Sequence, residues 1–223
     1  MRDVIEYAQG GEIVRMVETI EQAPGFDTTS GNWLCLDFTH TLDGRYDAYP
    51  KELLNNYGDL VSWGRYVHIL KDDEARSLRE EATSHPVEAS AALERAIVLR
   101  EAIYRLFLAI AEDRSPREAD LDTLNAALAE ALSHARIVPA DHGFVWDWAG
   151  REVDLNSMLW QVVRSAADLL TAEELDAVRA CASEDCRWLF VDTSKNRSRR
   201  WCDMKTCGNR NKAHRHYERK KQA

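Results

Sequence analysis

Four cysteines near the C-terminus constrain the fold of this chain more than any other feature. They form two matching pairs, Cys181/Cys186 and Cys202/Cys207, with four residues inside each pair and fifteen between the pairs. A gap of four residues lets a tight turn aim both thiolates at one point, and two such turns supply the tetrahedral sulfur coordination that zinc prefers. The spacing therefore predicts that Cys181, Cys186, Cys202 and Cys207 bind one Zn²⁺ ion.

Two other interpretations of these cysteines are a pair of disulfides or four separate buried thiols. The matching pairs disfavour separate thiols. Disulfides belong to oxidising compartments, whereas this sequence has no N-terminal apolar signal core and no apolar run near the ~20 residues that a membrane helix needs. We therefore expect a cytoplasmic protein with no membrane contact. Because four thiolates leave no open coordination position for water, the metal is expected to be structural.

The segment between the two pairs predicts a zinc ribbon. Residues 187–192 are typical of a strand, 193–198 of a polar turn, and 199–202 of a returning strand. Such a small segment cannot bury enough apolar surface by itself, so metal binding is expected to supply much of its folding free energy. The fifth cysteine, Cys35, lies in an apolar run and is predicted to be a small core residue.

The charge of the chain is divided unevenly. The formal net charge is −9, yet residues 187–223 hold twelve Lys or Arg against three acidic residues, while residues 1–186 hold 17 basic against 35 acidic residues. An acidic body with a basic tail is typical of proteins whose tail binds a polyanion. The negative total therefore does not exclude a nucleic-acid partner.

The basic tail predicts a helix after the last cysteine. Residues 208–221 contain no proline, and Lys212, Arg215 and Arg219 would share one face of that helix. These cations suit a phosphate backbone, in the first place of double-stranded DNA, with RNA as the nearest alternative. Asn209 and Arg210 either contact base edges or cap the helix. The candidate nucleic-acid contacts are Arg197, Arg199, Arg200, Asn209, Arg210, Lys212, Arg215 and Arg219.

The rest of the chain predicts a mainly helical domain. With 223 residues, 45% of them hydrophobic, the chain is long enough for one full core and a small appendage. Apolar periodicity predicts helices over 52–70, 73–83, 86–113, 115–132 and from 154, a strand over 33–39, and a hairpin of 135–138 with 144–148 whose turn exceeds two residues. The expected fold class is α+β: residues 1–175 form a mainly α-helical domain with a small β component, and residues 176–223 form a zinc-ribbon-like module ending in a basic helix.

Two capping boxes set helix starts in this interpretation. Ser115-Pro116-Arg117-Glu118 and Thr171-Ala172-Glu173-Glu174 each place a hydroxyl three residues before a glutamate, which favours a helix start at the hydroxyl residue. The second box is predicted to open a helix that leads rigidly into the cysteines.

The C-terminal module resembles the CGNR zinc-finger proteins, a family of bacterial transcription regulators. The resemblance covers about forty residues. It is carried by Cys181, Cys186, Trp188, Phe190, Asp192, the block Arg199-Arg200-Trp201-Cys202, Met204 and the tetrad Cys207-Gly208-Asn209-Arg210. Members of this family carry an N-terminal domain called ABATE, regarded as the ligand-sensing part of stress-induced regulators. The resemblance thus implies a DNA-binding regulator with a small-molecule effector. In this interpretation the N-terminal domain senses that ligand or forms a homodimer.

The ABATE domain has a looser counterpart in the body. Residues 34–41 resemble its opening strand and residues 57–63 resemble its first helix, although the family usually has asparagine where this chain has His40. The candidates for a ligand pocket are Trp33, Asp37, His40, Tyr57 and Trp63. Aromatic residues at helical spacing fit a hydrophobic core equally well, so both interpretations of these side chains stay open.

Two further function classes deserve comparison with a regulator. An enzyme would need a polar site such as Asp37, His40, Asp43 and Arg45, but no P-loop, nucleophile elbow, HExxH or GxGxxG pattern accompanies them, so we expect no enzymatic activity. A protein-interaction module would dock its basic tail on an acidic partner, including the acidic body of a second copy. Binding to nucleic acid at low salt separates this class from the regulator.

Overall fold

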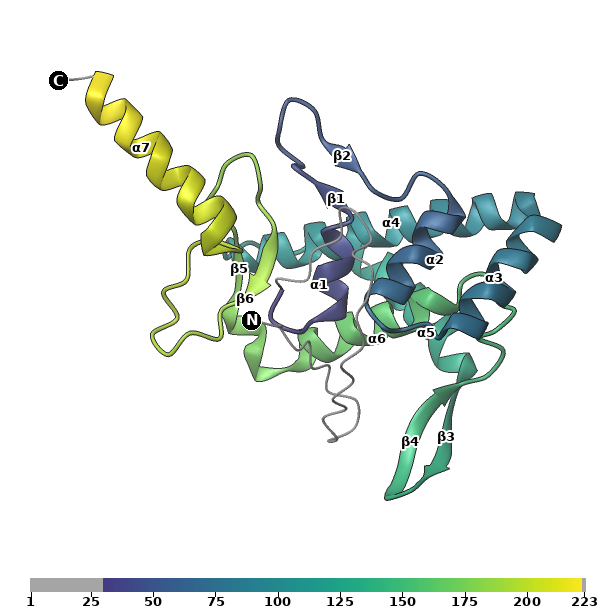
Figure 1. Cartoon of the computed structure of the whole chain (residues 1–223). Coiled ribbons are helices and arrows are strands. Elements are labelled where there is room, and N and C mark those ends of the chain that lie inside the picture. Colours follow the sequence, from purple (N-terminus) through teal and green to yellow (C-terminus); the bar gives the residue numbers. More distant parts are fainter. Residues whose placement is uncertain (1–29, 222–223) are drawn as a thin grey trace.

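The computed structural model describes residues 30–221, which are mainly helical with three small antiparallel sheets (Figure 1). The helices are α1 (Leu34–Thr39), α2 (Tyr57–Tyr66), α3 (Asp72–Ser84), α4 (Pro86–Ala111), α5 (Glu118–His134), α6 (Ser157–Thr171) and α7 (Asn209–Lys221). The strands are β1 (Leu42–Asp43), β2 (Lys51–Glu52), β3 (Ala135–Ala140), β4 (Gly143–Trp148), β5 (Val178–Ala180) and β6 (Leu189–Val191). A 3₁₀ turn, η1 (Glu173–Ala177), and a π-helical turn, η2 (Met204–Gly208), complete the elements. The α+β prediction is confirmed.

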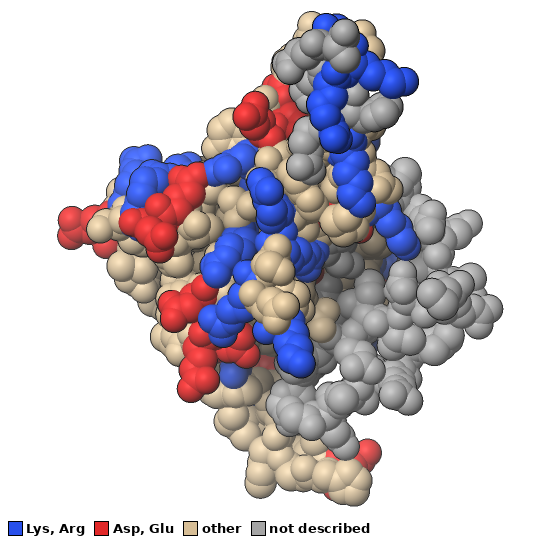
Figure 2. Space-filling model, turned by 90° about the vertical axis from the view of Figure 1, so that its left-hand side faces the viewer, with Lys and Arg blue, Asp and Glu red and all other residues tan. Residues whose placement is uncertain are grey.

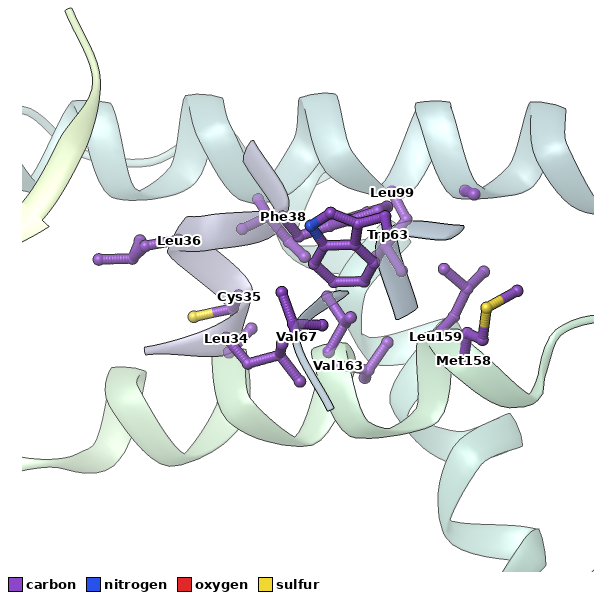
Figure 3. Close-up of a cluster of buried hydrophobic side chains, with 14 of the residues drawn as sticks. Leu34, Cys35, Leu36, Phe38, Trp63, Val67, Leu99, Met158, Leu159 and Val163 are labelled. Atoms are coloured by element: carbon purple, nitrogen blue, oxygen red, sulfur yellow. The ribbon is translucent and has the colours of Figure 1, made fainter. Parts of the chain in front are cut away.

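The core of the body lies between α4 and α6. The helices α1 and α2 pack between these two, and their apolar side chains meet in a single cluster (Figure 3). At its centre the rings of Phe38 and Trp63 lie 4.8 Å apart, and both side chains are almost fully buried. Burial of such large side chains is the main stabilising contribution to a domain of this kind. Among the described helices, none is both long and apolar enough to traverse a bilayer.

The segment predicted as a strand over 33–39 is the short helix α1, so this prediction was wrong. All six of its residues are buried, and continuous burial does not distinguish a strand from a helix. A strand here would need a hydrogen-bonding neighbour, whereas a helix satisfies its backbone internally. The hydroxyls of Thr39 and Thr41 also donate to the carbonyls of Leu36 and Phe38, which favours the helical turn.

The starts of two helices differ from their predictions. Helix α2 begins at Tyr57 because Asn56 and Asp59 form a capping box, and the residues before it include β2. Helix α5 begins at Glu118 with no side-chain cap, so the predicted box at Ser115 does not form. Its first turn is held instead by Asp120, a buried carboxylate that accepts hydrogen bonds from Arg105 at 2.6 and 3.0 Å.

The helix predicted from Thr171 is also absent. Thr171 ends α6, where its hydroxyl donates to the carbonyls of Ala167 and Asp168 and so is not available to cap a following helix. The chain continues through η1 into β5, which pairs antiparallel with β6. The expected hairpin between 187–192 and 199–202 is therefore replaced by a pairing across the first cysteine pair.

The hairpin of β3 and β4 confirms one prediction and corrects its turn. The strands extend to Ala140 and Gly143, leaving a two-residue turn of Asp141 and His142. Gly143 has φ +107°, a conformation that other residues rarely adopt. The glycine thus allows a tighter connection than the composition of the loop suggested. Helices α3, α4 and α6 were predicted correctly apart from small shifts at their ends.

Candidate metal centre and nucleic-acid interface

The first cysteine pair forms a turn at the end of β5. The amide of Cys181 donates to the carbonyl of Trp188 at 2.7 Å, which anchors the turn to the strand pair. Inside the turn, the amides of Cys186 and Arg187 both donate to the carbonyl of Ser183, and Arg187 has φ +55°. This left-handed residue closes the turn, so that both sulfurs point to the same side.

The second pair forms a matching turn before α7. Asp203 accepts hydrogen bonds from the amide and hydroxyl of Thr206 at 2.8 and 3.0 Å, which caps η2. A Cβ atom at position 208 would lie 2.7 Å from the sulfur of Met204, so Gly208 permits a close approach that a larger residue would block. The two turns are tied together by a hydrogen bond of 2.8 Å from the amide of Ala182 to the carbonyl of Arg200.

The four sulfur atoms converge on one point. The Sγ atoms of Cys186 and Cys202 lie 3.6 Å apart, those of Cys202 and Cys207 lie 3.7 Å apart, and all four lie within 4.8 Å of one another. A tetrahedral zinc with Zn–S bonds of about 2.3 Å requires S–S separations of roughly 3.8 Å, whereas a disulfide requires about 2.0 Å. All four cysteines are buried, free thiols, so the two alternative interpretations are contradicted.

The thiols influence one another's ionisation. Hydrogen bonds accepted from Cys186 and then from Cys202 and Cys207 lower the pKa of Cys181 far below its usual range. The hydrogen bond between the thiol of Cys186 and Cys181 in turn raises the pKa of Cys186. Four thiols this close to one another are suited to a cation that replaces their protons. The donor set and spacing thus fit one structural zinc ion, with no ligand position left for water.

Arg210 supplies a compensating charge at this centre. Its guanidinium lies 3.4 Å from the Sγ atom of Cys207 and 3.1 Å from a carboxylate oxygen of Asp185. Asn211 donates to the hydroxyl of Ser183 at 3.0 Å and to the carbonyl of Cys207 at 3.1 Å. The first turn of α7 is therefore bonded to both cysteine turns.

Asn209 is placed as a helix residue. Its side-chain amide donates to the carbonyl of Lys205 at 3.1 Å, one turn earlier in the chain. Asn209 and Arg210 had two possible roles in the sequence, base contact or helix structure. In the structure both side chains bind the protein itself, and both residues are exposed on their outer side.

The loop between β6 and the second pair is organised by Asp192. This buried carboxylate accepts hydrogen bonds from the amides of Ser194 and Arg199 at 2.9 and 2.8 Å. Burial alone would raise its pKa, but the bonds from Ser194 and from the backbone hold the pKa of Asp192 below its usual range. The loop 193–199 is thus a fixed structure in which residues 193–198 are exposed.

The three arginines predicted in this loop have different environments. Arg199 lies over the ring of Phe190 at 4.4 Å and donates to the carbonyls of Trp201 and Cys202, so it holds the second cysteine turn in place. Arg200 is exposed and lies over the ring of Trp201 at 5.5 Å. Arg197 is exposed at the tip of the loop.

The helix α7 carries most of the remaining cations. It projects from the module (Figure 1), and Lys212, Arg219, Lys220 and Lys221 are exposed along it. The helical spacing of 212, 215 and 219 confirms that these positions share a face, although the side chain of Arg215 lies outside the described part. Figure 2 shows Lys and Arg side chains along this projecting helix and on the face below it.

The module is fastened to the body through β5 and β6. The amide of Asp192 donates to the carbonyl of Ala177, and the amide of Val191 donates to the carbonyl of Ser30, both at 2.8 Å. Arg187 forms an ion pair with Glu112 near the end of α4. Leu189 and Val191 belong to the core cluster of the body, whereas Phe190 belongs to the cluster that contains the cysteines.

His40 also lies at this junction. Its ring stacks on that of Trp188 with centroids 4.3 Å apart and planes 7° apart, and its Nε2 atom donates to the carbonyl of Leu189 at 2.9 Å. Asp37 lies 3.8 Å from its Nδ1 atom. These two members of the predicted ligand pocket therefore face the module.

The other pocket candidates are aromatic residues that contact the core of the body. Trp63 is in the centre of the body core, and the hydroxyl of Tyr57 donates to the carbonyl of Leu155 at 2.9 Å. Trp33 is partly buried against the same core, and its carbonyl accepts a hydrogen bond of 3.1 Å from the amide of Asp37. The contacts of Tyr57 and Trp63 described above do not include Asp37 or His40, and a ligand pocket there stays a prediction.

Arg45 and Asp43 of the hypothetical enzyme site make structural contacts. Arg45 donates to Glu101 at 2.6 Å and lies over the ring of Tyr104, while a carboxylate oxygen of Asp43 accepts from the amide of Gly44. Glu101 in turn accepts from Arg100, a buried arginine that also binds Glu52 through two bonds of 2.7 Å. These contacts hold the β1–β2 loop against α4.

Sequence reasoning missed several residues that shape the metal centre. Ser183 and Asp185 lie inside the first cysteine turn, and Asp203 and Gly208 flank the second. Short polar residues and glycine between paired cysteines are the usual signal of a tight turn. That signal was present in the sequence.

Comparison with known families agrees with this geometry. Residues 32–173 match the ABATE family, described as "putative stress-induced transcription regulator", and residues 177–220 match the CGNR zinc finger. No curated protein matches the chain. Neither match is to an enzyme family. The chain therefore belongs to the ABATE family of transcription regulators and carries a zinc-binding CGNR finger at its C-terminal end.

Proposed function

We propose that this regulator binds double-stranded DNA through the exposed cations of its C-terminal module, while zinc holds that module in its binding shape. The main support for the proposal is the set of contacts that connects the metal centre to α7. The first turn of α7 is bonded to both cysteine turns through Arg210 and Asn211, and the cations that follow are exposed. A rigid base with a projecting row of positive charge suits phosphate contact.

The cations of the module divide into two groups in this proposal. Arg199 and Arg210 are bonded to the second cysteine turn and the thiolate cluster, so they act on binding through the fold. Arg197, Arg200, Lys212, Arg215 and Arg219 are the proposed phosphate contacts. In this assignment, substitution of the first group lowers DNA binding by disturbing the fold of the module, whereas substitution of the second group removes a phosphate contact and leaves the fold intact.

The test is the salt dependence of binding by the full-length, zinc-loaded protein. Fluorescence anisotropy with duplex DNA is expected to show log K falling linearly with log salt, with a slope of about −0.9 for each phosphate contact. Lys212→Ala is expected to reduce the magnitude of that slope by about one. Lys51→Ala, which removes an exposed lysine of the body, is the matched control and is expected to leave the slope unchanged.

Parallel titrations with single-stranded DNA and duplex RNA decide between partners. Tighter binding to RNA than to duplex DNA at the same salt would replace the DNA proposal with an RNA-binding one. Absence of binding to every nucleic acid at low salt, together with pairing to an acidic protein, would favour a protein-interaction module. Effector binding by the body stays a separate prediction, tested by thermal shift with candidate small molecules.

A further inference from the structure

The β3–β4 hairpin carries an apolar face that leaves the body. Because Ile137 pairs with Trp146 and Ala135 with Trp148, these side chains lie on one face of the hairpin. At the base, Trp148 is buried next to Trp160, with ring centroids 6.0 Å apart. Toward the tip the same face is exposed: 54% for Ile137, 50% for Trp146 and 74% for Phe144. Figure 1 shows the hairpin extending away from the helices.

The two edges of this hairpin differ in their capacity to pair. The amide of Ala149 donates to the carbonyl of His134, so the hydrogen-bonded pairs alternate from there toward the turn. The backbone groups of Phe144 and Trp146 consequently point outward from β4. On the β3 edge the corresponding residue is Pro139, which has no N–H group to donate. Within residues 30–221 no third strand joins this sheet.

We propose that β4 pairs with β4 of a second copy of this chain, antiparallel about a two-fold axis through Val145. In this register Phe144 of each copy lies directly opposite Trp146 of the other, which gives two cross-strand aromatic pairs. A shift of two residues would bring in either the buried Trp148 or the turn residue His142. The chosen register is the one whose hydrogen-bonded pairs use only Phe144 and Trp146, the exposed residues of β4 with outward-pointing backbone groups.

Charge and shape favour a second copy as the occupant. Asp147 of one copy lies opposite Gly143 of the other, so no two carboxylates face each other across the new pair. Asp147 is already paired with Arg136 of its own hairpin at 2.5 Å. Because the strands are antiparallel and the hairpin tip points away from the body, the two bodies lie at opposite ends of the shared four-stranded sheet.

This pairing does not rest on the proposed DNA contacts, and it is measured without nucleic acid. Sedimentation equilibrium of the zinc-loaded, full-length protein over a concentration series is expected to show a monomer–dimer equilibrium. A charge on an exposed edge strand opposes pairing, so Phe144→Lys is expected to weaken the dimer by about tenfold or more. The matched control is Ile137→Lys, which places the same charge on the same face at the β3 edge and is expected to have a much smaller effect.

Cross-linking tests the register. Val145 of each copy forms a non-hydrogen-bonded pair, in which Cα atoms lie about 4.5 Å apart, within the range that a disulfide spans. Val145→Cys is therefore expected to give a covalent dimer on mild oxidation of the zinc-loaded protein. Val138→Cys is the control, since Val138 pairs with Val145 inside the hairpin but lies on β3. The unsubstituted protein controls for Cys35, which is fully buried, and for the zinc ligands.

Three results would overturn the proposal. The first is a protein that stays monomeric at every concentration. The second is equal weakening by Phe144→Lys and Ile137→Lys, which would move the contact from the β4 edge to the whole hairpin face. The third is a dimer that Val145→Cys does not link. Unchanged far-ultraviolet circular dichroism of each variant shows that the body has folded.

Discussion

The body and the C-terminal module are folded by different means. The body, residues 30–175 of the described chain, buries a large apolar cluster that takes in side chains from α1, α2, α4 and α6. Among the described residues of the module, the cluster around the metal centre consists of six buried residues, and four of them are the cysteines. The two others are Trp188 and Phe190. Apolar burial therefore suffices for the body, whereas the module depends on the bonds between sulfur and metal.

Strand β6 joins these two kinds of core. Side chains alternate across a strand, so Leu189 and Val191 point to the body while Phe190 points to the cysteines. Three consecutive residues of β6 therefore contribute to both cores. The predictions below separate the two cores, starting with the largest expected effect.

Loss of zinc is expected to unfold the module and spare the body. Apparent zinc-binding free energies in zinc-finger peptides are about 10–16 kcal/mol, far more than six buried residues supply. Replacing Cys181 and Cys202 together by serine is expected to abolish zinc binding and to remove hydrogen-exchange protection from η2 and the start of α7. Helices α4 and α6 are expected to keep theirs.

Cys35→Ser is the matched control for this experiment, because it changes a cysteine that is buried outside the cluster. Burial raises the pKa of Cys35 to about 12, so its thiol is a neutral core group and zinc content is expected to stay at one ion. Equal protection of the module in the zinc-free double variant would contradict the comparison.

Neighbouring substitutions in β6 are expected to damage different cores. Leu189→Ala is expected to destabilise the body by about 2–5 kcal/mol through lost apolar contacts, with zinc content unchanged. Phe190→Ala is expected to cost about 3–5 kcal/mol of module stability and to speed zinc transfer to a chelator. Chemical denaturation and chelator competition, run on both variants, check the two effects.

If both substitutions changed zinc transfer to the same degree, the two cores would behave as one cooperative unit. The two cores would then differ in the residues that form them but not in how they unfold.

Asp192 is expected to make the module sensitive to acid. Its folded pKa is below the unfolded value of about 3.9, so its stabilisation is complete above that value and is lost as the pH falls through the folded pKa. Asp192→Asn is expected to lower module stability at neutral pH by about 1–3 kcal/mol, because the acceptors for the partly buried amides of Ser194 and Arg199 are weakened.

The measurement is the difference between the two proteins as the pH is lowered from 6 to 3. Protonation of the thiolates releases zinc from both, so only the difference reports on Asp192. A constant difference over the whole range would contradict this role.

Substitutions of Arg199 and Arg200 are expected to have different effects, the first on the structure of the module and the second on its contact with DNA. Arg199→Ala removes donors to the carbonyls of Trp201 and Cys202 and is expected to weaken zinc retention. Arg200→Ala is expected to change stability by no more than about 0.5 kcal/mol and to reduce the salt slope of DNA binding by about one. Chelator competition and anisotropy titration together check the pair.

The metal centre was more predictable from sequence than the fold around it. Two equal cysteine spacings define a donor set whatever the connecting structure is, so Cys181, Cys186, Cys202 and Cys207 could be identified without knowing the strand pairing. The partner of β6 could not be identified, because the short segments that begin at Val178 and at Arg199 have no periodicity that distinguishes a strand from a loop. Asp192 decides the outcome by holding residue 199 in a loop.

Burial on all sides explains the main error in the body. All of residues 34–39 are buried, so their pattern does not distinguish a strand from a helix, and their helical form follows from the neighbours that surround them. The start of α2 was missed for a different reason, since Asn56 and Asp59 formed a capping box that the apolar spacing over 52–70 concealed. The ligand pocket and the nucleic-acid contacts depend on partners and stay predictions.

The sharing of β6 limits how far the finger can be separated from its host. A fragment beginning at residue 177 would expose Val178, Leu189 and Val191 to water, because their apolar partners belong to the other part of the chain. Transplanting this finger onto an unrelated protein would therefore carry an adhesive surface along with the metal site. In this protein the body covers that apolar surface, so the finger and the body form one structural unit.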